Sequence, residues 1–252
     1  MKNLLAAASL LALASAAQAQ ISIPGPAFVY TQNFETLPTT GATNAWANDS
    51  TLTGWSLFSS TGVAVTNIRA DAGTSNTGAI YSYGSTGSTE RALGAVASGS
   101  FTGSIVLALT NNSGVLLDSF SLVYGGEQWR NGGNTSAQTL AFEYGFGATL
   151  AAAAFTPLPG FGFTSPVVGA TAGAVDGNGA GSVANLGGTV GAAWAVGDTL
   201  WLRWVDLNDA GNDHGLALDN VSFSVTAVPE PGTVALWLAG LAAIGFVARR
   251  RG

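Results

Sequence analysis

The chain has 252 residues, of which 47% are apolar, 35 are glycine and only 9% are charged, with a formal net charge of −6. This composition excludes a disordered chain held open by charge, because such chains combine low hydrophobicity with high net charge. There is no cysteine and one histidine, which excludes disulfides, cysteine-ligated metals, thiol nucleophiles and a multi-histidine metal site within one chain. The acidic balance and the few scattered arginines argue against nucleic acid as a partner.

The N-terminus has the three parts of a secretory signal peptide. A short positive head, Met1–Asn3, precedes the apolar run Leu4–Ala14, and Ala17 and Ala19 then form a small-x-small cleavage pattern. We predict that signal peptidase removes residues 1–19 and that Gln20 begins the exported domain. A permanent N-terminal anchor is the alternative, which the shortness of the apolar run disfavours.

The C-terminal part combines a proline-flanked motif, an apolar segment and a basic cluster. The motif consists of Val228, Pro229, Glu230 and Pro231. It is followed by Thr233–Ala248, sixteen residues without a charge, and by Arg249–Arg251. A helix of that length spans about 24 Å against a hydrocarbon core of about 30 Å, a mismatch that local thinning of the bilayer accommodates. We predict a single transmembrane helix with the arginines on the cytoplasmic side and the body outside.

Taken in this order, the three parts resemble the PEP-CTERM sorting signal of Gram-negative bacteria, over residues 228–252. The resemblance implies that the inner membrane first anchors the chain with its body in the periplasm. An exosortase, a membrane cysteine transpeptidase, then transfers or releases the body to the cell surface or beyond. Exopolysaccharide and biofilm are the expected surroundings. The alternative is a plain C-terminal anchor with a proline-stiffened linker.

The same kind of tail is also catalogued under an ice-binding protein C-terminal label. The label implies no affinity for ice. An ice-binding face would need a regular ladder of threonines or similar side chains, and the threonines of this chain fall at irregular intervals.

Between these segments, from residue 20 to 227, the hydrophobic periodicity is two. Leu140, Phe142, Tyr144 and Phe146 alternate with smaller or polar residues, as in a half-buried strand. Comparable patterns predict further strands at Phe28–Phe34, Trp55–Phe58, Val63–Ile68, Ala79–Tyr83, Ile105–Leu109, Phe120–Tyr124, Leu200–Trp204 and Val221–Val225. Many short strands and no amphipathic helix predict an all-β, antiparallel β-sandwich.

The body also resembles a widespread and largely uncharacterised bacterial secreted module. The segments that carry the resemblance are Thr31–Phe34, Thr53–Trp55, Ser88–Gly94, Gly125–Arg130, Trp201–Trp204 and Asp213–Asn220. The resemblance implies a lectin-like jelly roll with an accessory or binding role, and it implies no particular ligand.

The loop that begins at Asp206 is rich in oxygen donors. Asp206, Asn208 and Asp213, together with Asp219, are candidate Ca²⁺ ligands, because this hard cation prefers oxygen donors held in a tight loop. The loop lacks the glutamate that ends an EF-hand loop. The alternative is a hairpin loop whose Asp and Asn side chains accept backbone hydrogen bonds.

A second candidate binding site contains Glu127, Trp129 and Arg130. The indole could stack on a sugar ring while the two charged groups bond its hydroxyls. The interpretation we favour is structural: a partly buried ion-pair network that joins Glu127 to Arg91, or Arg130 to Glu90.

No catalytic set is marked in the sequence. His214 follows an aspartate, but the chain has no Gly-x-Ser-x-Gly nucleophile motif, so we predict that His214 is a hydrogen-bonding loop residue. No spacing brings any two glutamates to the separation that glycoside hydrolysis needs; the candidates are Glu35, Glu90, Glu127 and Glu143. We therefore predict a non-enzymatic surface or extracellular-matrix protein. A carbohydrate-binding, calcium-stabilised module is the alternative, and a glycan-active enzyme the third interpretation.

Overall fold

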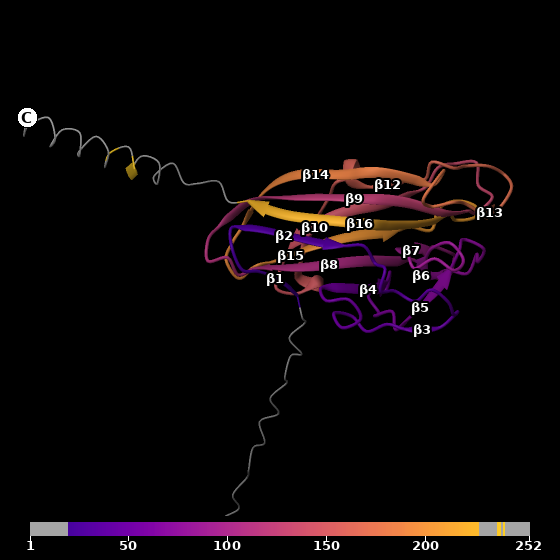
Figure 1. Ribbon diagram of the computed structural model, residues 1–252, viewed down its shortest axis with the longest axis horizontal. Helices are drawn as coiled ribbons and strands as arrows, with labels where there is room; N and C mark the ends of the chain where they lie inside the picture. The colour runs from indigo at the N-terminus through magenta and orange to yellow at the C-terminus, as the bar shows by residue number, and fades with distance from the viewer. Residues whose placement is uncertain (1–19, 227–235, 238, 240–252) are drawn as a thin grey trace, which may run out of the picture.

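The computed structural model describes residues 20–226 together with Leu236, Trp237 and Ala239. The described body is all-β, as predicted, and its strands form two sheets (Figure 1). The predicted signal peptide and the motif Val228–Pro231 lie outside the described residues. Of the predicted transmembrane segment, only the three residues named above are described, and they are helical. No helix in the described part of the chain is long and apolar enough to cross a bilayer.

The first sheet has seven strands, with the spatial order β1-β8-β15-β10-β11; β4 pairs with β8 and β12 with β10. Its strands are β1 (Ile21–Ile23), β4 (Trp55–Ser59), β8 (Gly103–Asn111), β10 (Thr139–Phe146), β11 (Ala154–Pro157), β12 (Phe163–Thr164) and β15 (Thr199–Asp206). Two 3₁₀ turns flank β11: η1 (Leu150–Ala152) and η2 (Pro159–Phe161).

The second sheet has nine strands, with the order β13-β9-β16-β7-β6-β5-β3; β14 pairs with β9 and β2 with β16. Its strands are β2 (Ala27–Gln32), β3 (Asn44–Ala45), β5 (Asn67–Asp71), β6 (Ala79–Tyr83), β7 (Ala92–Val96), β9 (Leu117–Asn131), β13 (Gly173–Ala174), β14 (Ser182–Trp194) and β16 (Gly215–Thr226). The long strands β9 and β16 lie inside this sheet, and the long strand β14 pairs with β9 alone.

Strand direction departs from the prediction in two places. β1 pairs with β8 and β5 with β6 in parallel, whereas the sequence predicted antiparallel pairing throughout. The prediction was wrong here because alternation of apolar and polar residues identifies a strand without giving its direction.

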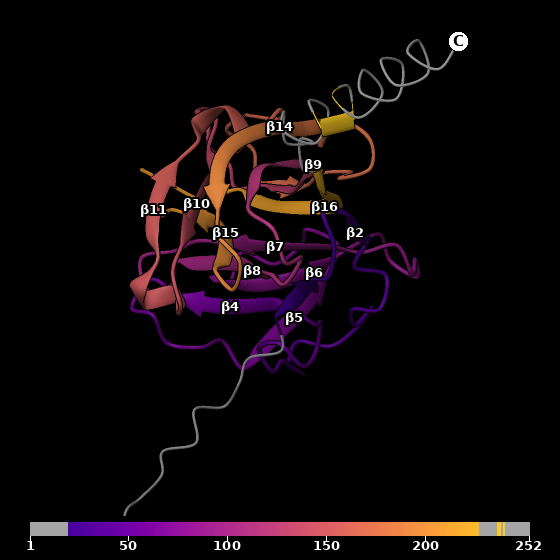
Figure 2. The ribbon, with the colours of Figure 1, turned by 90° about the vertical axis from the view of Figure 1, so that its left-hand side faces the viewer.

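The facing sides of the two sheets share one core. Tyr124 of β9 meets Trp204 of β15 edge-to-face at 5.6 Å between ring centroids, and Phe120 of β9 meets Tyr144 of β10 at 5.5 Å. Figure 2 shows β10 and β11 on one side of the body and β9 and β16 on the other. Each buried aromatic side chain removes about 150–250 Å² from water, so this shared layer is the main source of stability.

Strand β15 is buried on both faces. Trp204 belongs to the shared core, whereas Trp201 packs with Val106 and Ala108 on the opposite side of the sheet, beneath Leu150 and its neighbours. Residues three apart on a strand point to opposite faces, as the sequence predicts for these two tryptophans.

Candidate functional site

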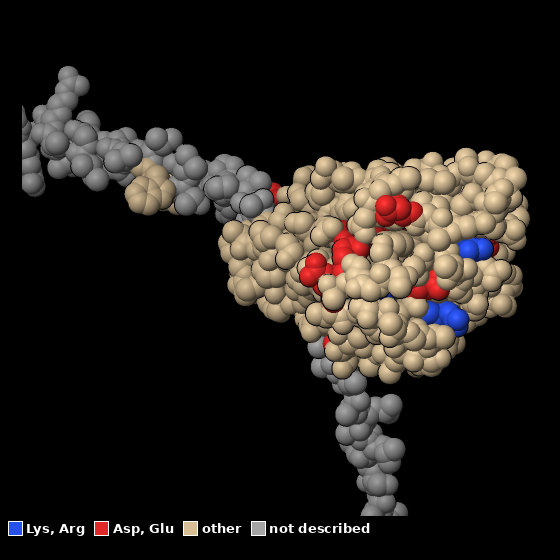
Figure 3. All heavy atoms as spheres, turned by 45° about the vertical axis from the view of Figure 1, so that its right-hand side comes forward, with Lys and Arg blue, Asp and Glu red and all other residues tan. Residues whose placement is uncertain are grey.

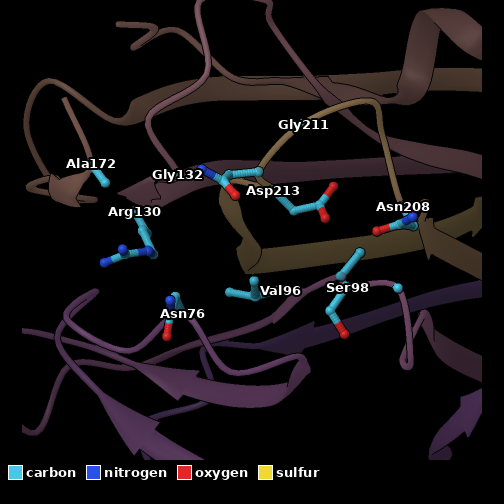
Figure 4. Close-up of a pocket in the computed structure, with 12 residues that line it drawn as sticks. Asn76, Val96, Ser98, Arg130, Gly132, Ala172, Asn208, Gly211 and Asp213 are labelled. Carbon is cyan, nitrogen blue, oxygen red and sulfur yellow. The ribbon is translucent and has the colours of Figure 1, made fainter. Parts of the chain in front are cut away.

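A polar pocket of about 260 Å³ lies where the loops at one end of the sheets meet. Its walls come from the ends of β7 and β9 and from the loop between β15 and β16. Figure 4 shows Asn76, Ser98, Arg130, Asn208 and Asp213 around one hollow. A pocket lined by amide, hydroxyl, carboxylate and guanidinium groups suits a small ligand rich in hydroxyls.

Three of the predicted calcium ligands belong to this loop region. Asp213 uses one carboxylate oxygen to accept the Asp209 backbone N–H at 2.9 Å, which is the hydrogen bonding expected of an Asx-rich loop. Asn208 and Asp213 line the pocket. Asp206 is buried, and burial next to Asp213 and Asp209 raises its pKa well above its ordinary value.

The fourth predicted ligand, Asp219, lies elsewhere, with Glu90 and Glu127. One carboxylate oxygen from each of these three side chains lies within 4.8 Å of the others. Within the described residues this is the group of three acidic side chains close enough to hold one metal ion. Sequence reasoning missed the grouping because the three residues are far apart in the chain and no spacing rule joins them.

The acidic cluster, Glu90, Glu127 and Asp219, is largely shielded from solvent. Glu127 and Asp219 are buried, and Glu90 is half-buried. Burial, with neighbouring carboxylates adding to it, raises the pKa of Glu127 to about 8 and that of Asp219 to about 7. Figure 3 shows Asp and Glu side chains at several places on the face in view, with Lys or Arg side chains toward its right-hand edge.

Trp129 is a packing residue in this structure. It is 1% exposed, stacks on Tyr83 with 6.1 Å between ring centroids, and donates its indole N–H to Glu127 at 2.8 Å. With Tyr81 and Ala217 it belongs to a small buried cluster on the outer side of the nine-stranded sheet. A side chain so covered has no free ring face to stack on a sugar.

The two buried arginines bind backbone oxygens and a serine. Arg130 donates from Nη1 to the carbonyls of Gly73 and Thr74 at 3.1 and 3.0 Å. Arg91 donates from Nε to the Ser82 hydroxyl at 2.8 Å and from Nη2 to the Ser82 carbonyl. Arg130 therefore ties β9 to the segment between β5 and β6, and Arg91 ties the start of β7 to β6.

The predicted ion pairs, Glu127 with Arg91 and Arg130 with Glu90, do not form. Over the described residues the one salt bridge joins Arg203 to Glu143 at 2.6 Å. It lies on the outer side of the seven-stranded sheet, where the Arg203 guanidinium also sits 3.7 Å from the centre of the Phe155 ring. A second, mostly apolar pocket of about 560 Å³ adjoins this pair.

His214 is completely buried and holds the loop in place. Its Nδ1 accepts the Gly132 backbone N–H at 2.9 Å, so Nε2 carries the proton and faces the Ser136 carbonyl at 3.3 Å. Its own backbone N–H donates to the Gln138 side chain at 2.5 Å. Burial lowers the pKa of His214. The predicted role of a hydrogen-bonding loop residue is confirmed.

Comparison with known proteins is informative mainly for the C-terminal tail. Residues 227–251 match the profile of the PEP-CTERM protein-sorting motif. No curated protein matches the chain. A solved structure described as the Agl-KA catalytic domain is 14% identical with a TM-score of 0.28, over 86% of this chain and 30% of that one. The motif match confirms the resemblance of the tail, and it indicates an exported protein that an exosortase sorts after transient anchoring in the membrane.

Proposed function

We propose that this chain is a surface or extracellular-matrix protein of a Gram-negative bacterium, associated with exopolysaccharide and biofilm. The observation that carries the proposal is the sorting motif at residues 227–251. Signal peptidase removes residues 1–19, the segment Thr233–Ala248 holds the body at the periplasmic side of the inner membrane, and the exosortase acts near Glu230. The body then remains at the surface or enters the matrix.

Replacing Glu230 with Ala tests the sorting step. Loss of the carboxylate between the two prolines is expected to leave the unprocessed chain in the membrane fraction, at the expense of the surface and medium fractions. Glu35→Ala is the matched control, since Glu35 is an exposed acidic residue of the body. Unchanged fractionation of the Glu230 variant would support a plain anchor instead.

The alternative function is carbohydrate binding at the polar pocket by a lectin-like jelly roll. Its support is the polar lining around Asn76, Arg130, Asn208 and Asp213. The pocket also lies at the opposite end of β16 from Thr226. β16 starts at Gly215 beside the pocket and ends at Thr226, where the chain continues toward the sorting motif, and a strand of this length spans about 40 Å. A site on that end stays accessible while the chain is anchored.

Pull-down of the protein by the producer's own exopolysaccharide tests the binding proposal. Asn208→Ala and Asn76→Ala remove hydrogen-bonding groups from the pocket wall and are expected to weaken the interaction several-fold. Asp118→Asn, a change at an exposed site in β9, is the control. Binding that neither pocket substitution alters would exclude this pocket as the glycan site.

The proposal describes a non-enzymatic protein. Support comes from the glutamates considered for glycoside hydrolysis: Glu143 is paired with Arg203, and Glu127 is buried against Trp129. A general acid and its partner must both reach the glycosidic bond, whereas these two of the four candidate glutamates are engaged in contacts within the protein. Turnover of the exopolysaccharide that a single Glu→Gln substitution abolishes would overturn this part.

A further inference from the structure

We propose that Glu90, Glu127 and Asp219 form a Ca²⁺ site on the outer face of the nine-stranded sheet, separate from the loop site that the sequence suggested. The site lies between the centre of the sheet and the loops that precede β7 and β14, and its role is to hold these segments together.

Strand register brings two of the ligands together. Glu127 is opposite Ala217 and Gly125 is opposite Asp219 in the antiparallel pair β9·β16. Residues opposite one another, and residues two apart, share a face of the sheet. Glu127 and Asp219 are therefore diagonal neighbours on one face, and Glu90 reaches them from the loop before β7.

The spacing suits calcium. Ca²⁺ binds oxygen ligands at about 2.3–2.6 Å, so two ligands of one ion lie no more than about 5 Å apart. The three carboxylate oxygens are within 4.8 Å of one another. Ca²⁺ tolerates irregular geometry, whereas Mg²⁺ requires a near-ideal octahedron.

Unused oxygen atoms provide a second, independent observation. Asp219 is 2% exposed, and its Oδ1 has no hydrogen-bond partner among the described residues. Oε1 of Glu90 is buried and unpartnered in the same way. Buried polar atoms are almost always hydrogen-bonded, and a buried carboxylate oxygen left without a donor is costly. A bound cation satisfies both atoms at once.

The other oxygen of each carboxylate is already held. Asn220 donates its side-chain N–H to Asp219 Oδ2 at 2.7 Å, Trp129 donates to Glu127 Oε2 at 2.8 Å, and Asn178 donates to Glu90 Oε2 at 2.6 Å. These bonds fix the carboxylates in orientation, as outer-shell partners do around metal sites. Asn178 precedes β14, so its bond ties that loop to the cluster.

Within the described residues no member of the cluster forms a salt bridge. Carboxylates this close repel one another unless they bind protons or a cation. Gly125 leaves room for an ion, because a Cβ at this position would meet only the Asp219 backbone, at 3.5 Å or more.

Calcium titration of the full-length chain in detergent, after EDTA treatment and dialysis, tests the proposal. Calorimetry is expected to show one Ca²⁺ per chain, and at about a hundredfold excess over Kd the melting temperature is expected to rise by roughly 5–10 °C. Tb³⁺ in place of Ca²⁺ provides a local readout. Its emission on excitation of tryptophan requires an indole nearby, and Trp129 contacts Glu127 directly.

Matched variants locate the ion. Asp219→Asn and Glu90→Gln keep the side-chain shape and are expected to lower the affinity at least tenfold and to abolish the Tb³⁺ signal. Two control variants, Asp213→Asn in the loop and Asp118→Asn on the surface, are expected to leave the calcium affinity and the Tb³⁺ signal unchanged. In EDTA the Asp219→Asn variant should melt at or above the wild-type temperature, because the substitution removes a buried charge. This melting temperature checks that the variant folds. If it does not fold, Glu90→Gln takes its place in the calcium and Tb³⁺ experiments.

Three results would overturn the proposal. The first is the absence of calcium binding by the wild-type chain at millimolar concentration, which would indicate carboxylates that share protons instead. The second is binding that Asp213→Asn removes and Asp219→Asn spares, which would place the ion in the loop. The third is equal stabilisation of wild type and the Asp219 variant by calcium.

Discussion

Single residues show where the sequence was informative and where it was not. The roles of His214 and of Trp201 and Trp204 follow from local rules, namely a polar loop and a strand period of two, and the structure agrees with them. The grouping of Glu90 with Glu127 and Asp219 depends on the register between distant strands. No pattern along the chain encodes that register.

Trp129 is expected to contribute to stability rather than to glycan contact. Trp129→Ala removes a fully buried side chain and its bond to Glu127, and should reduce the free energy of unfolding by about 3–5 kcal/mol. Urea unfolding measures this change. Val63→Ala, at an exposed residue, is the control and should have an effect within about 0.5 kcal/mol. A Trp129 variant of unchanged stability that loses glycan binding would contradict this role.

Asp206 is expected to make stability fall as the pH rises. Its pKa in the folded protein is raised well above 3.8 by burial and by Asp213, so the native state holds a proton that the unfolded state has already lost. The stability that the protonated Asp206 contributes is complete below the pKa of the unfolded state, and it is lost as the pH rises through the pKa of the folded state. Asp206→Asn carries no such proton and removes this dependence.

The measurement is the melting temperature of Asp206→Asn relative to wild type, in EDTA between pH 4.5 and 8. The melting temperature of the variant should rise relative to that of wild type as the pH increases. For a domain of this size, each 1 kcal/mol of difference in the free energy of unfolding corresponds to about 2–4 °C. The melting temperature of Asp118→Asn should differ from that of wild type by the same amount at every pH. A constant difference across the range would show that Asp206 is not a buried proton-binding group.

At the scale of elements, alternation located most of the long strands but missed β7 and β14. Ala79–Tyr83 is recovered as β6 with the predicted bounds, whereas the strand predicted at Val63–Ile68 begins only at Asn67 as β5. β7 is buried throughout, so its sequence has no alternation to detect. β14 contains three glycines and a single buried residue, which weakens its apolar pattern along the sequence.

The glycines of β14 allow a direct test of how closely it packs on β9. Gly187 has φ = 112°, and a Cβ there would lie 2.1 Å from the Leu122 carbonyl oxygen. Gly187→Ala should therefore cost about 1–3 kcal/mol through strain and overpacking. Gly191 has open space around it, so Gly191→Ala should change stability by less than about 0.5 kcal/mol. Chemical denaturation compares the two, and equal effects would contradict the described register.

At the scale of the whole molecule, the polar pocket lies at one end of the two packed sheets, and Ile21 and Thr226, near the two limits of the described body, lie at the other. Arg130 and Gly215 are paired next to the pocket, while Thr226 pairs with Ala27 near the end from which the tail continues. The sequence could predict the tail because its three parts are contiguous. It could not predict the pocket, which is assembled from five separate segments.

Export and sorting are tested most directly by the intact mass of the protein recovered from the surface and medium of the producing cells. We predict a chain that begins at Gln20 and has lost the apolar and basic residues after the Pro229–Pro231 motif, and we predict that this species is absent from cells without exosortase. A recovered chain that retains Met1–Ala19, or one that retains Thr233–Arg251 whether or not exosortase is present, would contradict the proposed function.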